Sequence, residues 1–130
     1  MKIQKQLLIL SLIGSFIALT ACTTINPPRV QPYLNRTFKL PYPMYLCSEN
    51  LNPPSRRYHL SPRPCQEASD IICLGIVPKN FPFSIKKYIR NNVEGYEDLY
   101  IVLKAGPHKG KLIDLHNFEK IFPEICHKPE

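Results

Sequence analysis

The chain has 130 residues, of which 17 are basic and 10 acidic, for a formal net charge of +7. This length allows one small domain, and the basic excess is typical either of a solvated surface or of contact with anionic material. No cysteines have CxxC spacing, and no histidines have HxH or HExxH spacing. These spacings therefore do not favour a dithiol redox site, a zinc ribbon or a common histidine metal site, and we expect neither metal nor cofactor.

The first 21 residues have the pattern of an export signal. Residues 1–6 carry two lysines as their only charges, and residues 7–19 form an apolar run of 13 residues, relieved by serines and a glycine. This run is shorter than the roughly 20 residues that span a bilayer, but it has the length of a signal-peptide core. We therefore expect a cleaved signal helix over residues 1–21, and the alternative is a buried helix of the folded domain.

The residues that end this run are Leu19-Thr20-Ala21-Cys22, and they resemble the bacterial lipobox. In lipoproteins of that family the cysteine thiol receives a diacylglycerol, the preceding peptide is removed, and fatty acids such as palmitate anchor the chain. The resemblance implies lipidation of Cys22 and a membrane partner reached through the anchor. Thr23, in place of aspartate, implies the periplasmic side of the outer membrane. Nucleic acid is not expected as a partner there.

The other cysteines are an even set: Cys47, Cys65, Cys73 and Cys126. In an oxidising envelope this count predicts two disulfides. We favour Cys47–Cys65, which closes the proline-rich segment, and Cys73–Cys126, which fastens the chain end to a core strand. The other two pairings stay open, because spacing alone does not choose among them.

The chain between the signal and residue 70 is rich in proline, with nine of the 14 prolines at residues 23–64. Proline lacks an amide donor and disfavours helix in the residue before it. We expect residues 22–32 to be an extended, lipidated tether. Residues 33–69 carry many apolar and aromatic side chains, so we expect an irregular or edge-strand segment that packs on the domain.

Short strands are predicted from residue 70 onward. Residues 70–77 are typical of a buried strand, residues 83–90 of a half-exposed strand, and residues 99–104 and 111–115 of two more. Residues 117–122 could form one helical turn, with Asn117 as its cap. The fold expected over residues 70–130 is mainly β, a small barrel or sandwich.

Residues 75–115 resemble a bacterial SH3-like small barrel. The matching parts are a strand that ends in Gly75-Ile76-Val77, a turn over residues 78–82, two strands, and a hairpin at Gly106-Pro107-His108-Lys109-Gly110-Lys111. This hairpin is also similar to the KOW motif, which we attribute to turn geometry. The resemblance implies an SH3-like domain, but the chain has no tryptophan, which peptidoglycan-binding SH3 modules often use.

Basic and aromatic residues of this region form a candidate partner-binding surface: Lys86, Lys87, Tyr88, Arg90, Lys109 and Lys111. The alternative is that the basic members are solvated, outward positions. No catalytic residue is predicted, because His127 adjoins Cys126 in sequence and adjacent side chains rarely face one another. The GxSxG pattern is also absent.

The function expected from these features is that of a non-catalytic lipoprotein that binds a periplasmic protein or peptidoglycan. Two alternatives stay open: an immunity lipoprotein that neutralises an envelope-targeting toxin, and a cell-wall hydrolase or its accessory subunit. The sequence leaves the oligomeric state open.

Overall fold

The computed structural model describes residues 23–51, 55–66 and 68–126. The predicted signal peptide and the lipidation site Cys22 lie outside these residues. Within the described ranges, no helix is both long and apolar enough to cross a membrane.

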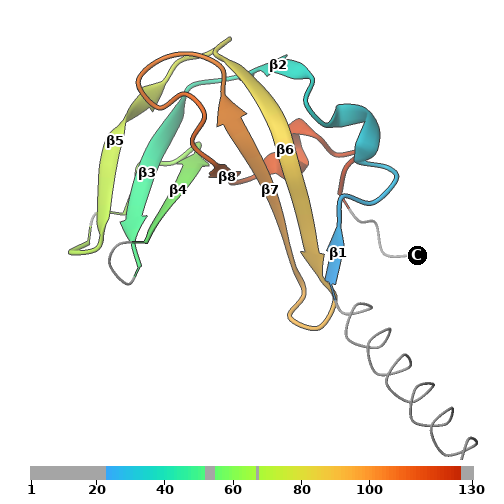
Figure 1. Ribbon diagram of the computed structural model, residues 1–130. Helices are drawn as coiled ribbons and strands as arrows, with labels where there is room; N and C mark the ends of the chain where they lie inside the picture. Colours follow the sequence, from blue (N-terminus) through green and yellow to red (C-terminus); the bar gives the residue numbers. More distant parts are fainter. Residues whose placement is uncertain (1–22, 52–54, 67, 127–130) are drawn as a thin grey trace, which may run out of the picture.

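Eight strands form one open sheet in the order β1-β6-β7-β8-β4-β3-β5, and β2 lies along the same edge of β6 as β1 (Figure 1). Neighbouring strands are antiparallel, except that β4 and β8 are parallel. A 3-10 turn, η1 (Gln31–Tyr33), and a short helix, α2 (Phe118–Ile121), complete the described structure. The predicted mainly-β class is confirmed. The strands are β1 (Thr23–Ile25), β2 (Thr37–Lys39), β3 (Met44–Asn50), β4 (Arg56–Ser61), β5 (Ile71–Val77), β6 (Pro82–Asn91), β7 (Tyr96–Leu103) and β8 (Ile113–Leu115).

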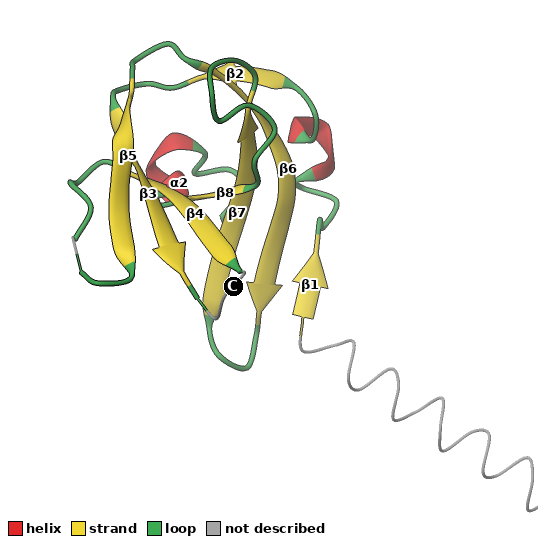
Figure 2. Cartoon of the chain, turned by 60° about the vertical axis from the view of Figure 1, so that its left-hand side comes forward, coloured by secondary structure: helices red, strands yellow, loops and turns green. Residues whose placement is uncertain are grey.

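The sheet curves around a single hydrophobic core, with β3, β4 and β5 on one side and β6 and β7 on the other (Figures 1 and 2). The aromatic rings of Phe38, Phe83 and Phe122 meet there, with ring centroids 5.0 to 6.1 Å apart. Such edge-to-face and tilted contacts stabilise the core beyond the burial of apolar area. The chain end is therefore part of the core.

A bulge in β6 changes which of its residues face inward. Phe83 and Ile85 are fully buried, and the pairing with β7 then shifts between Ile85 and Lys87. Beyond the shift the buried residue is Tyr88, at an even position. Because strand side chains alternate between faces, one extra residue reverses the inward positions. The prediction that Tyr88 belongs to a partner-binding surface is therefore wrong.

Residues 23–32 were expected to be a tether, and the structure corrects this expectation. Thr23, Thr24 and Ile25 pair with β6, and Val30 is fully buried in the core. The Asn26 side chain also accepts a hydrogen bond of 2.8 Å from the backbone N–H of Tyr88. Proline restricts φ, but it does not prevent a segment from docking through its other residues.

Residues 33–69 were expected to be irregular or an edge strand, yet they supply two inner strands of the sheet. Met44 and Leu46 of β3 and Leu60 of β4 are at most 2% exposed. The prolines of this segment lie between the strands and leave β3 and β4 uninterrupted. A count of prolines over the whole segment missed this, because proline disrupts pairing only where a ladder amide is needed.

The C-terminal helical turn is confirmed as α2, but its predicted cap is wrong. Asn117 adopts a left-handed conformation with φ of 58° and makes no capping hydrogen bond through its side chain. The connection between β7 and β8, residues 104–112, is a longer loop than the tight hairpin expected. Its glycines, Gly106 and Gly110, have φ of 78° and 81°, a conformation that favours glycine.

Candidate functional site at the free edge of strand β5

The predicted basic surface is divided between distant parts of the sheet. On β6, the Lys86 ammonium donates a hydrogen bond of 2.9 Å to the side-chain carbonyl of Asn35. Arg90 Nε lies 4.0 Å from a carboxylate oxygen of Glu97 on β7, a weak surface ion pair. Lys87, also on β6, is half-buried.

The other two predicted lysines lie in the 104–112 loop and belong to a different region. Lys109 is exposed, and the Lys111 ammonium lies 4.8 Å from the centre of the Tyr58 ring on β4. Since β7 and β8 separate β6 from β4 in the sheet, the structure does not bring these lysines together with those of β6.

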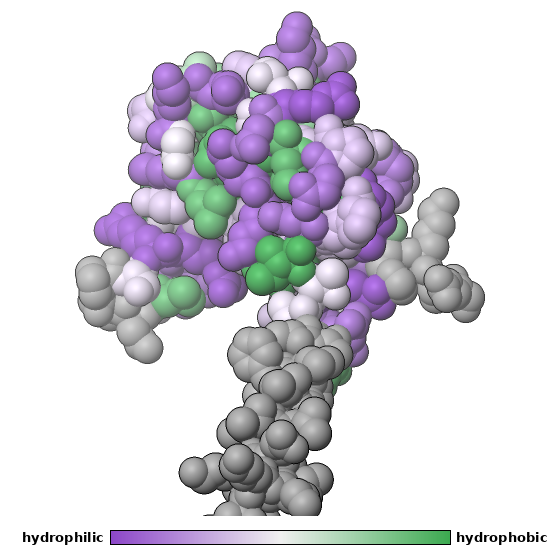
Figure 3. All heavy atoms as spheres, turned by 45° about the vertical axis from the view of Figure 1, so that its right-hand side comes forward, coloured by the Kyte–Doolittle hydropathy of each residue, from purple (hydrophilic) through white to green (hydrophobic). Residues whose placement is uncertain are grey.

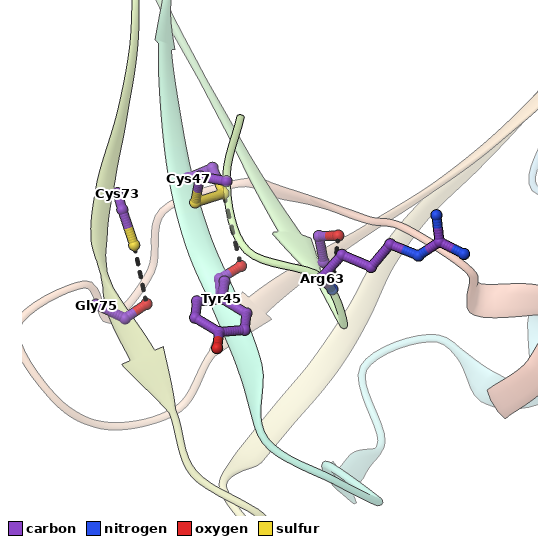
Figure 4. Close-up of a disulfide and its surroundings, with 7 residues drawn as sticks. Tyr45, Cys47, Arg63, Cys73 and Gly75 are labelled. Atoms are coloured by element: carbon purple, nitrogen blue, oxygen red, sulfur yellow. Dashed lines mark hydrogen bonds between the residues drawn. A yellow bond between two sulfur atoms is a disulfide. The ribbon is translucent and has the colours of Figure 1, made fainter. Parts of the chain in front are cut away.

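The disulfide Cys47–Cys65 is present, with the two Cα atoms 5.8 Å apart, so this predicted pairing is confirmed (Figure 4). The second predicted bridge, between Cys73 and Cys126, is not formed, and both thiols are free. Cys73 is exposed on β5, opposite Cys47 in the pairing of β3 with β5. Cys126 lies beyond α2, where its thiol contacts the carbonyl oxygen of Phe122 at 3.8 Å. The two residues are thus held by different elements.

Strand β5 was predicted to be buried, but it forms an exposed edge of the sheet. Among the described residues its ladder is with β3 alone. An isolated bridge joins Ile71 to Ala68, and beyond Ile71 the outer backbone groups of β5 join no further described strand. Ile72 and Ile76 are 49% and 59% exposed, and Cys73 is exposed beside them. An apolar strand with a free edge is a template for pairing with another chain.

A groove lies beside β5, between this strand and the 104–112 loop, with a cavity volume of about 180 Å³. Its walls are apolar apart from one polar side chain, His108. Apolar walls of this kind receive aliphatic or aromatic side chains, because water leaves such surfaces favourably. The lining residues are Leu46, Leu74, Gly75, Ile76, Val77, Pro78, Phe81, Leu103, Ala105, Gly106, Pro107 and His108.

The wall formed by the loop depends on glycine at position 106. A Cβ atom there would lie 3.3 Å from the Phe81 ring, and the φ of 78° is strained for other residues. Gly106 thus allows the loop to approach Phe81 closely. The shape of the groove follows from this contact.

A second region gathers titratable side chains at the junction of β4 and β8. The imidazole rings of His59 and His116 are stacked, with centroids 4.5 Å apart and planes 7° from parallel. His116 Nε2 lies 3.9 Å from a carboxylate oxygen of Asp114. Burial lowers the pKa of both histidines, and burial together with the charge of Asp98 raises the pKa of Asp114 to about 7. Near neutral pH, Asp114 of this His–Asp cluster therefore exchanges its proton more readily than an ordinary carboxyl group, whereas the two histidines bind theirs less readily than free imidazole.

The chemistry open to the described residues is limited. They contain no group of three or more His, Cys, Asp or Glu side chains that could hold a metal ion. Burial also raises the pKa of the Cys126 thiol, whereas a nucleophilic cysteine needs a lowered pKa. The His–Asp cluster can exchange a proton. The Ser61 hydroxyl lines the same pocket as His59 and His116, and it accepts a hydrogen bond from the backbone N–H of Arg63.

The β5 edge, its groove and the His–Asp cluster were not predicted from the sequence. A continuous apolar run such as residues 71–77 fits a buried strand as well as an edge strand, because it has no alternation of apolar and polar residues that would mark an exposed face. The stacked histidines are 57 positions apart in sequence and meet because β4 and β8 are parallel neighbours. The GPxKG pattern was a usable signal for the loop that walls the groove.

No protein-family model, curated protein or solved structure matches the chain. A proposal for its function depends on the chemistry of the N-terminal residues and on the geometry of β5 and its groove.

Proposed function

We propose that the chain is a membrane-anchored periplasmic lipoprotein, without catalytic activity, that binds a protein partner along the free edge of β5. The anchor is supported by the basic start, the apolar run and the Leu19-Thr20-Ala21-Cys22 sequence. Thr23, the residue after the cysteine, supports placement on the periplasmic side of the outer membrane. Acyl chains on a terminal cysteine give stable attachment when two or more are present.

The observation that carries the binding function is the exposed, apolar β5. An added strand would hydrogen-bond to its free backbone edge. Because the pairing of β5 with β3 shifts between Gly75 and Cys73, side chains of that strand would contact Ile76 on one face of the sheet and Ile72 on the other. The neighbouring groove would take an apolar side chain of the partner. The partner is thus a protein segment in extended conformation that carries apolar side chains.

The chemistry of the groove favours a protein over peptidoglycan. Sugar hydroxyls need hydrogen-bonding groups when they leave water, and the groove offers one polar side chain, that of His108. The absence of tryptophan from the chain removes the side chain most suited to stacking on sugar rings. The raised pKa of Cys126 supports the non-catalytic part of the proposal.

We also propose an SH3-like description for part of the sheet. Its support is the consecutive antiparallel pairing of β6, β7 and β8. The strands β3 and β4 enlarge the sheet beyond residues 70–116, so the description applies to the later strands and not to the whole domain.

The anchor is tested with Cys22→Ala in cells fed labelled palmitate. The native chain should be labelled and cleaved, and the variant should be neither. Continued labelling of the variant would overturn the lipobox interpretation.

The binding surface is tested by placing a photo-crosslinking amino acid at Ile76 in living cells. The matched control places it at Leu112, which is 50% exposed and lies outside the groove. We expect one discrete protein adduct from position 76, lost when Ile72→Lys adds a charge to the strand. Equal adducts from both positions, or none from position 76, would contradict the proposed surface.

A further inference from the structure

The first described residue pairs at the far end of the β6–β7 hairpin. Thr23 is the partner of Asn91, the last residue of β6, and Asn91 also pairs with Tyr96, the first residue of β7. Residues 92–95 form the turn beyond this level. In Figure 1 the start of β1 and the β6–β7 turn lie at the same end of the sheet.

The distance from the anchor to this turn is set by the chain itself. Cys22 precedes Thr23 by one peptide bond, and consecutive Cα atoms are about 3.8 Å apart. Thr23 is already held in the sheet, so no spacer separates a lipidated Cys22 from the domain. A lipid at that position brings the bilayer surface to the level of Asn91 and Tyr96.

We propose that the β6–β7 turn rests on the lipid bilayer, with Val93 in the interfacial layer. This inference rests on the proposed function, because it needs the lipid on Cys22. The surface that would meet the membrane consists of residues 91–96 together with Ile25.

The side chains of this surface suit a lipid interface. Val93 is 74% exposed, Ile25 is 55% exposed and Tyr96 is 41% exposed. An apolar tip with a tyrosine beside it matches the boundary between headgroups and acyl chains, where amphipathic rings are favourable. Figure 3 shows apolar surface at the lower end of the domain, surrounded by more hydrophilic surface.

The backbone of the turn is also prepared for a less polar environment. The Asn91 side-chain carbonyl accepts hydrogen bonds from the N–H groups of Val93 and Glu94, at 3.0 and 2.8 Å. These two donors need no water when the turn approaches the bilayer. The exposed carboxylate of Glu94 opposes attraction to anionic headgroups, so the contact depends on apolar side chains and on the anchor.

The contact fixes the orientation of the domain. From the level of Asn91, β6 extends about 26 Å to the level of Phe83, at a rise of about 3.3 Å per residue. Phe83 pairs with Leu103, the residue that precedes the 104–112 loop. The groove, which this loop walls, therefore lies at the end farther from the membrane, where a periplasmic partner can reach it.

The chain has no tryptophan, so a single introduced indole reports its own position without background. The probe variant is Val93→Trp, and the matched control is Lys109→Trp, exposed in the loop at the opposite end. Both are purified as mature lipidated proteins, which begin at Cys22, from palmitate-fed cells and reconstituted into phosphatidylcholine vesicles. Quenching is measured with vesicles whose phosphatidylcholine is brominated along the acyl chains.

We expect the Val93→Trp protein to lose most of its tryptophan emission in brominated vesicles. In unbrominated vesicles its emission maximum should lie at shorter wavelength than that of the same protein in buffer after its lipid has been removed. The Lys109→Trp protein should keep its emission. A palmitate-labelled Val93→Trp protein without quenching would overturn the membrane contact and leave the anchor intact. Absence of palmitate label from both proteins would overturn the anchor, and the contact with it.

Discussion

Arg29 donates a hydrogen bond of 2.9 Å from its guanidinium to the hydroxyl of Tyr88, which is fully buried on β6. Its Nε donates a second bond of 2.7 Å to the backbone carbonyl of Ile125, near the chain end. The guanidinium carbon also lies 5.2 Å from the centre of the Tyr88 ring. One side chain thus fastens the N-terminal segment, the central strand and the C-terminal segment together.

Replacing Arg29 tests whether residues 23–32 belong to the folded domain. Arg29→Met keeps the aliphatic stem but leaves the Tyr88 hydroxyl and the Ile125 carbonyl without these donors. We expect the free energy of unfolding to fall by about 1.5–3 kcal/mol, the range for hydrogen bonds that involve a charged group. Urea denaturation measures it, with Arg56→Met on β4, an exposed position, as control. Equal stability of the two variants would instead support the expectation that residues 23–32 are a tether outside the folded domain.

The Cys47–Cys65 disulfide closes a segment with a sequence separation of 18. Its removal in the double variant Cys47→Ala/Cys65→Ala should lower the free energy of unfolding by about 3 kcal/mol, because the unfolded chain regains loop entropy. Thermal and urea unfolding check this value. Cys73→Ala, at an exposed free cysteine, should change stability by less than about 0.5 kcal/mol. An effect as large as that of the double variant would show that Cys73 also bonds covalently.

The free thiols give a count that the sequence alone did not predict. The native oxidised protein should react quickly with a thiol reagent at Cys73, which is exposed, and slowly at Cys126, whose pKa is raised by burial. Unfolding in urea without reductant should reveal both. Ellman titration of the native, Cys73→Ala and Cys126→Ala proteins assigns each signal. A titration with no free thiol would instead support the predicted disulfide between Cys73 and Cys126.

Asp114 predicts a pH dependence of stability whose sign can be worked out. Burial, followed by the charge of Asp98, raises its pKa from 3.8 to about 7 in the folded state. Between these values the unfolded chain loses its proton first, so stability from this group falls as pH rises and stays low above 7. Asp114→Asn removes the loss. As pH rises from about 4 to about 7, the free energy of unfolding of the Asp114→Asn variant, relative to that of the native chain, should rise by about 1–3 kcal/mol, after allowance for solvent screening.

The two histidines of the cluster act in the opposite sense and would obscure this effect in the native protein alone. Their lowered pKa values mean that the unfolded chain binds protons more readily, so stability from His59 and His116 is lost as pH falls below 6.5. The difference between native and variant urea curves, measured at each pH, separates the contributions. Asp70→Asn, at an exposed carboxylate, serves as control. A difference that does not change with pH would contradict the raised pKa of Asp114.

The sequence predicted what local pattern controls. The alternation of residues 83–90 and the apolar run of residues 99–104 correspond to β6 and β7, and the last helical turn was found as α2. The bulge after Ile85 could not be predicted, because it depends on pairing with β7 and not on the residues of β6 alone. Tyr88 was assigned to the wrong face for this reason.

Features that depend on distant partners escaped prediction. Whether β5 is a central or an edge strand depends on which strands lie beside β3 and β5, and the apolar pattern of residues 71–77 fits both positions equally well. Val30 follows two prolines and a basic residue, so its full burial reflects contacts made across the fold. Of the candidate site, the sequence supplied the turn glycines and the first disulfide, while the groove and the His–Asp cluster arise from tertiary pairing.

The short strand β8 is the single link in the strand order between two halves of the sheet, β1-β6-β7 and β4-β3-β5. Its pairing with β4 joins Tyr58 to Ile113 and Leu60 to Leu115. The half built from residues 44–77 therefore cannot join the other half until β8, one of the last strands of the chain, has formed. Such non-local closure slows folding, to milliseconds or longer in β proteins. A chain that emerges N-terminus first cannot join the two halves of its sheet until residues 113–115 have emerged.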